Sequence, residues 1–126
     1  LKALQELTRV LRSGGKLILT APFCSLTHFA PYHYSTGFNK YFYLYHLTEL
    51  GYHDINVTEN GNYFEFMAQE LRRIQPMAEK YAGSSLTAEG EFAISTLLTL
   101  LQGFSDRDSG SSEMLHFDCQ VIATKN

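Results

Sequence analysis

One short run constrains the fold more than any other part of this chain. Residues 16–23 read Lys-Leu-Ile-Leu-Thr-Ala-Pro-Phe, and Gly14-Gly15 stands directly before them. The apolar residues are continuous rather than alternating, which is typical of a parallel strand buried on both faces. Pro22 has no N–H group, so ladder pairing is expected to fail near that point. The run therefore predicts a strand at about 16–21 in the interior of a sheet.

Periodic patterns on either side of this strand predict the other elements. Leu1, Leu4, Leu7 and Val10 recur at helical spacing and predict an amphipathic helix over 1–12, which ends at Gly14-Gly15. Asn39 and Thr87 are candidate caps of two later helices. The remaining predicted helices cover 39–50, 63–82 and 87–103, and the remaining predicted strands cover 54–59 and 115–125.

The alternation of these elements predicts an α/β fold with a mostly parallel sheet. A three-stranded sheet rarely buries a strand on both faces, so further strands are expected outside this sequence. The 126 residues suit one core, and we expect a single partial domain over 1–126. Within it, 62–104 is interpreted as a helical insertion before the last strand.

Composition and charge exclude several classes of function. A net charge of −3 gives no long-range attraction for phosphate backbones, so we expect no nucleic-acid partner. No apolar run approaches membrane-spanning length, and no signal-peptide layout is present, so no membrane partner is expected. Cys24 and Cys119 are interpreted as reduced thiols of a cytoplasmic protein. Leu1 already lies in a helical pattern, which suggests a piece of a longer protein.

The segment from Glu6 to Pro22, Glu-Leu-Thr-Arg-Val-Leu-Arg-Ser-Gly-Gly-Lys-Leu-Ile-Leu-Thr-Ala-Pro, closely resembles a segment of class I S-adenosylmethionine-dependent methyltransferases. In that family, a helix ending in an Arg-Val-Leu-Lys-Pro-Gly-Gly-like run leads into the fifth strand of a seven-stranded sheet. Ser13 stands where the family usually has Pro. The resemblance implies that the chain is the C-terminal half of a Rossmann-like methyltransferase sheet.

The rest of the chain follows the order of the same family. Lys40 to Leu50 resembles the helix after the fifth strand, and Leu50-Gly51-Tyr52 resembles the turn into the sixth. Phe117 to Lys125 resembles the seventh strand. The family's Gly-rich turn after its first strand, which holds the cofactor, has no counterpart here. S-adenosylmethionine is therefore implied for a parent protein, and this chain alone is expected to bind it weakly and to be inactive.

The loop after the first strand carries the candidate site. In open α/β sheets the site lies beyond the carboxyl ends of the strands, so Phe23 to Ser35 is expected to face it. His28 and His33 are candidate general bases, because imidazole titrates near neutral pH. Structural or surface roles are the alternative for both histidines, and simple packing is the alternative for the aromatics. The candidate substrate-binding residues are Phe23, Tyr32 and Tyr34.

Three further expectations concern ligands and assembly. Cys24, His28 and His33 lack the paired close spacing of zinc sites, so no metal is expected. The parent protein is expected to methylate a small molecule; the alternatives are a non-catalytic remnant or adaptor, and another doubly wound fold such as an oxidoreductase. A homo-oligomer is expected to cover the exposed sheet edge or face.

Overall fold

The computed structural model describes residues 1–28, 30–33 and 35–126. These residues form two compact units, the first of which comprises Leu1–Asn60 together with His116–Asn126. The second unit is Gly61–Leu115 and contains the whole stretch that the sequence suggested as a helical insertion. We call them the sheet unit and the helical unit.

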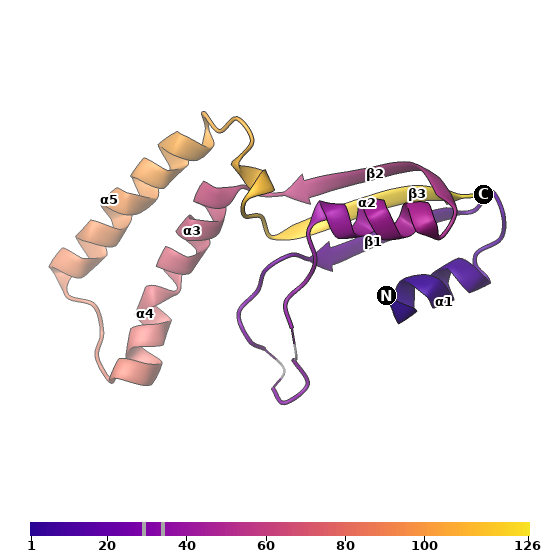
Figure 1. Ribbon diagram of the computed structural model, residues 1–126. Coiled ribbons are helices and arrows are strands. Elements are labelled where there is room, and N and C mark those ends of the chain that lie inside the picture. Colours follow the sequence, from indigo (N-terminus) through magenta and orange to yellow (C-terminus); the bar gives the residue numbers. More distant parts are fainter. Residues whose placement is uncertain (29, 34) are drawn as a thin grey trace. The chain divides into compact units, whose positions relative to one another are not determined.

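The sheet unit is built on three strands, β1 (Lys16–Pro22), β2 (Tyr52–Asn60) and β3 (Asp118–Lys125). Their spatial order is β1-β3-β2, and β3 pairs antiparallel with both neighbours (Figure 1). The expectation of a mostly parallel sheet is therefore wrong for these strands. The reason is visible at the end of β2, where the N–H of Phe117 donates to the carbonyl of Asn60 at 2.9 Å. The chain re-enters the sheet beside the carboxyl end of β2, so β3 runs in the direction opposite to β2.

One face of the sheet carries the core. Side chains alternate along each strand, and the inward-facing ones pack under α1 (Lys2–Val10) and α2 (Lys40–Glu49). Leu47 in α2 and Val121 at the centre of β3 have no exposed surface. The core cluster comprises Leu4, Leu17, Tyr43, Leu47, Tyr52, Cys119, Val121 and Ala123.

The opposite face of the sheet is exposed in its middle. Ile18 in β1 is 75% exposed, and its Cα partner Ile122 in β3 is 44% exposed. The prediction that β1 is buried on both faces is wrong, because only alternate residues such as Leu17 are buried. Within the sheet unit, both helices contribute to the core on the other side, which leaves these two isoleucines without cover.

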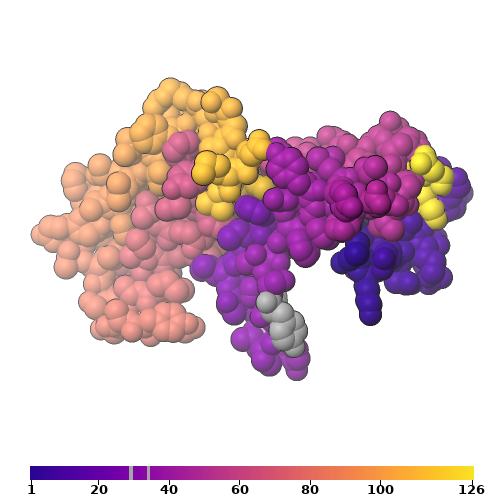
Figure 2. Space-filling view, viewed as in Figure 1, coloured from indigo at the N-terminus to yellow at the C-terminus, as the bar shows by residue number. Residues whose placement is uncertain are grey.

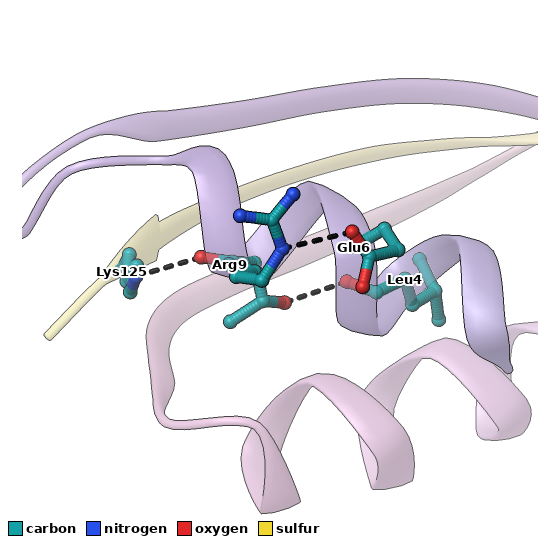
Figure 3. A network of polar contacts seen from close by, with 5 residues as sticks. Leu4, Glu6, Arg9 and Lys125 are labelled. Carbon is teal, nitrogen blue, oxygen red and sulfur yellow. Dashed lines mark hydrogen bonds and ion pairs between the residues drawn. The ribbon is translucent and has the colours of Figure 1, made fainter.

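The end of α1 is fixed by a lysine from β3. Lys125 Nζ donates to the carbonyl oxygens of Thr8 and Leu11, each at 2.7 Å, which satisfies acceptors that the last turn of a helix leaves open. Figure 3 shows Lys125 beside the end of α1. Its positive charge also complements the negative end of the helix dipole. Gly14 follows with φ of 71°, a left-handed conformation that glycine adopts without a steric penalty.

The helical unit is an antiparallel hairpin. Its first arm is α3 (Tyr63–Arg72), followed by α4 (Ile74–Met77) and a π-helical turn (Ala78–Ala82). The predicted helix over 63–82 is thus interrupted, because Pro76 has no N–H group for the helical ladder. The second arm is α5 (Ala88–Ser105), and a 3-10 turn (Ser111–Glu113) leads back to β3.

Polar caps and one ring contact join the two arms of the hairpin. The side chain of Asn62 accepts from the Glu65 N–H at 3.0 Å and donates to Ser105 Oγ at 2.9 Å, so one amide caps α3 and binds the end of α5. The rings of Phe64 and Phe104 lie with centroids 5.4 Å apart. No helix within the described ranges is long and apolar enough to cross a bilayer.

Candidate functional site

The segment between β1 and α2 stands out from the sheet unit (Figure 2). Its base is closed by backbone hydrogen bonds, from Phe23 N to Phe117 O at 2.9 Å and from Gly37 N to Phe23 O at 3.0 Å. Position 37 must be glycine, because a Cβ atom there would lie 1.2 Å from the carbonyl oxygen of Pro22. A close backbone approach therefore fixes both ends of the loop that carries the predicted site.

The loop brings the two predicted histidines together. The ring centroids of His28 and His33 lie 4.6 Å apart with an interplanar angle of 33°. His28 Nδ1 lies 2.9 Å from the carbonyl oxygen of Leu26. A carbonyl only accepts, so in the neutral ring Nδ1 carries the proton and Nε2 is the basic nitrogen. His28 is exposed and His33 is half-buried, so this imidazole pair lies at the surface of the loop.

The predicted aromatic contacts have different surroundings. Tyr32 is 78% exposed and so presents its ring to solvent. Phe23 is half-buried and stacks on His116, with centroids 4.2 Å apart and an interplanar angle of 15°. Tyr34 lies outside the described residues. The structure thus places Tyr32 with the histidines on the loop, and it places Phe23 against the interior of the sheet unit.

A buried pair escaped the sequence analysis. The predicted strand over 115–125 starts too early, because β3 begins only at Asp118 and His116 lies before it. His116 has no exposed surface, and its Nε2 lies 3.3 Å from Cys119 Sγ. The only signal in the sequence was that a histidine and a cysteine stand three residues apart.

Cys119 is a neutral thiol rather than a nucleophile. Burial raises its pKa, and the nearby carboxylates of Glu59 and Asp118 raise it further. The thiolate is the reactive form of cysteine, so this environment suppresses reactivity. Its Sγ lies 3.9 Å from the carbonyl oxygen of Phe38, which gives the S–H an acceptor at the start of α2.

Polar side chains gather where β1 and β2 end and β3 begins. Lys40 pairs with Glu59 at 3.3 Å, and both side chains are largely buried. Asn60 Nδ2 donates to Asp118 Oδ2 at 2.9 Å, while Asp118 Oδ1 is buried and has no hydrogen-bond partner among the described residues. Buried polar atoms of this kind commonly meet a water or a ligand. Asp118 is therefore a further candidate for contacting substrate at this edge of the sheet.

The glycine pair before β1 does not form a cofactor-binding turn. Gly14 and Gly15 close a helix, and their backbone groups are already used. Gly14 N donates to Lys125 O, Gly15 N donates to Arg12 O, and Gly15 O accepts from Lys125 N, each at 2.9 Å. A cofactor turn instead presents unused N–H groups at the start of a helix. No step of chemistry is therefore assigned to a cofactor held by these glycines.

Within residues 1–28, 30–33 and 35–126, no group of three or more His, Cys, Asp or Glu side chains could hold a metal ion. Comparisons with known protein families, characterised proteins and solved structures give no match to this chain.

Proposed function

We propose that the chain is the substrate side of an S-adenosylmethionine-dependent methyltransferase that acts on a small molecule. The observation that carries this proposal is the order of the elements along the chain. The resemblance assigns β1, β2 and β3 to the fifth, sixth and seventh strands of the methyltransferase sheet, with α2 as the helix between the first two. The elements occur in that order, and the three strands pair into one sheet.

The local geometry of the resembling segment supports the same proposal. Residues 6–22 form the end of a helix, a left-handed turn at Gly14 and a strand, in the order that the resemblance implies. The helices α1 and α2, which precede β1 and β2, contribute to one core on one face of the sheet. An antiparallel sheet whose strands follow one another without intervening helices would lack both the helix-turn-strand order and the shared helical core.

The candidate chemistry of this chain is removal of a proton from the methyl acceptor. An acceptor hydroxyl or amine bound beside the loop would give its proton to His28 Nε2, because Nδ1 already donates to Leu26. The adjacent His33 ring and the exposed Tyr32 ring would bound the acceptor. Positioning and exclusion of water then supply the rest of the catalytic effect.

The proposal predicts how binding is divided between this chain and the rest of a longer polypeptide. S-adenosylhomocysteine titrated calorimetrically into the chain alone should give no binding heat. The same titration into a protein that also includes the polypeptide encoded upstream should give micromolar binding. Failure of the longer protein to bind would overturn the proposal in favour of a non-catalytic remnant or adaptor. Micromolar binding by the chain alone would show that the argument about Gly14 and Gly15 is wrong.

The histidine pair can be tested in the same longer protein. His28→Ala should lower kcat by about 100-fold or more if the imidazole is the general base. His46→Ala is the matched control, since His46 lies on α2 outside the loop. Equal activity of the His28→Ala and His46→Ala proteins would assign His28 a structural role.

The sheet surface supports a proposed homo-oligomer. Only one edge of β1 is paired within the described chain, and Ile18 and Ile122 are exposed on the bare face. Unpaired edges and apolar faces favour association. Ile18→Lys should therefore weaken any oligomer that forms through this surface, as read by sedimentation velocity.

A further inference from the structure

The helical unit has an apolar face that its own two arms do not cover. On α5, one row of exposed apolar residues begins at Ala93 and continues four, seven and eleven residues later. Its large members are Leu97, Leu100 and Phe104, which are 44%, 51% and 41% exposed. We call this set, with the exposed Ala93, the α5 seam. Ile94, Leu98 and Leu101 lie on a second stripe and are less exposed, which is consistent with packing against α3.

The first arm carries a matching set, which we call the α3 seam. This row begins at Tyr63 in α3, runs through α4 and ends at Tyr81 in the π-helical turn, with a spacing of alternately four and three residues. Glu70 is the one polar residue in the row. Glu70 is paired with Arg73 at 3.1 Å, so the seam has no unpaired charge. The apolar members, each at least 37% exposed, are Tyr63, Met67, Ile74, Met77 and Tyr81.

The two seams lie on the same face of the hairpin. A shallow groove between the arms is lined on its polar side by Arg72, Gln75, Glu91 and Ser95. On a helix of 3.6 residues per turn, these positions lie on the flank of each arm opposite to the seam. One face of the unit is therefore polar, and the other presents two parallel apolar rows.

We propose that this apolar face binds a second copy of the same chain, with α5 packed antiparallel on α5. The area is sufficient. At these exposures, side chains of about 200 Å² each leave on the order of 800 Å² on the face, which is what one partner contributes to a standard interface. Steps of four and three are the spacing of knobs-into-holes packing, so the partner is a helix pair, and two hairpins make a four-helix bundle.

The α5 seam is complementary to itself, which favours a second copy over another protein. A two-fold axis between Leu98 and Thr99 sets Leu97 of one copy against Leu100 of the other. It also sets the small Ala93 against the large Phe104, which fills space without a clash. An isologous contact requires this kind of symmetry.

Charges at the ends of α5 agree with the antiparallel arrangement. Glu89 stands in the first turn of α5 and Arg107 stands just after its last turn, with the guanidinium 5.8 Å from the centre of the Phe104 ring. Both side chains flank the α5 seam. The two-fold axis brings Glu89 of one copy beside Arg107 of the other, whereas a parallel arrangement would bring like charges together.

Sedimentation velocity over a wide concentration range tests the proposal. The chain should be a dimer at micromolar concentration, and Leu97→Asn with Leu100→Asn should raise the dissociation constant by at least 100-fold. Phe92→Asn is the matched control, because Phe92 is 74% exposed on α5 outside the seam. A chain that remains monomeric at about 100 μM, or a dimer that only Ile18→Lys disrupts, would overturn the proposal.

A charge exchange gives a second test that leaves the apolar residues intact. Glu89→Arg alone and Arg107→Glu alone should each weaken the dimer several-fold, and more so at low salt. The double variant Glu89→Arg/Arg107→Glu should recover the original affinity, because each pair is reformed across the two-fold axis. Additive weakening in the double variant would rule out the antiparallel register.

Discussion

His116 Nε2 lies 3.3 Å from Cys119 Sγ, and neither side chain has any exposed surface. The histidine is also stacked on Phe23, the first residue of the loop that carries the candidate site. The pair therefore connects the start of β3 with the base of that loop. Burial and the neighbouring carboxylates raise the pKa of the Cys119 thiol and so favour its protonated form.

This environment predicts a difference between the two free cysteines. In the folded chain, iodoacetamide should modify the half-buried Cys24 readily and leave the fully buried Cys119 unmodified. In denaturant both should react at similar rates. Peptide mass spectrometry after brief labelling at pH 8 distinguishes them. Equal labelling in the folded chain would show that the sheet unit opens at β3.

Two raised pKa values predict a loss of stability in alkali. Burial raises the pKa of Tyr43, and burial likewise raises the pKa of Cys119. The folded chain therefore favours the protonated, uncharged form of both side chains. Their contribution to the free energy of unfolding is complete below the pKa of the thiol in the unfolded chain, about 8.5. It is lost as the pH rises through the raised pKa values of the folded chain.

Variants of these two residues test the pH dependence directly. Tyr43→Phe/Cys119→Ala should lose less free energy of unfolding between pH 8 and pH 11 than the original chain, even if it is less stable at pH 7. Urea titration at each pH gives the comparison. A variant with the same alkaline slope as the original chain would assign the loss to other groups.

The contact between Lys125 and α1 predicts a specific destabilisation. Lys125→Met removes two charge-assisted hydrogen bonds to the carbonyls of Thr8 and Leu11, and should cost about 1–3 kcal/mol. Lys16→Met, at an exposed position of β1, should change stability by no more than about 0.5 kcal/mol. Hydrogen exchange should show faster exchange of the α1 amides only in the first variant.

Glycine replacements at two positions should have opposite effects. Gly37→Ala places a Cβ atom against the carbonyl of Pro22, so the base of the loop must shift at a cost of about 1–3 kcal/mol. Gly90→Ala meets nothing closer than Leu86 Cδ2 at 3.4 Å in α5, and should stabilise the helical unit by about 0.5–1 kcal/mol. Thermal unfolding of the two variants provides the check, and a neutral Gly37→Ala would show that the loop base is adaptable.

Local signals in the sequence predicted most of the elements. Asn39 and Thr87 do cap α2 and α5, accepting from the N–H groups of Phe42 and Gly90. These predictions succeeded because a cap or a glycine turn depends on a few neighbouring residues. The same holds for the position of β1, which begins directly after the glycine turn at Gly14-Gly15.

Non-local features could not be predicted in the same way. The apolar run at 16–22 suggested burial on both faces, but whether Ile18 is covered depends on elements far away in sequence. The direction of β3 depends on the end of the sheet at which the chain returns after the helical unit. The number of residues between β2 and β3 does not reveal that end. His116 lies before β3, which begins three residues later than the predicted strand over 115–125, and a period-two pattern does not locate a strand boundary that closely.

The central position of β3 orders the events of synthesis. β1 and β2 do not pair with each other within the described residues, and each pairs with β3. β3 is translated only after the whole helical unit, so these pairings form late. Helices with local contacts form quickly, while sheets that join distant segments form slowly. In a nascent chain the helical hairpin would thus be complete before β1 and β2 gain β3 as their shared partner. Chaperones that shield exposed strands would act during that interval.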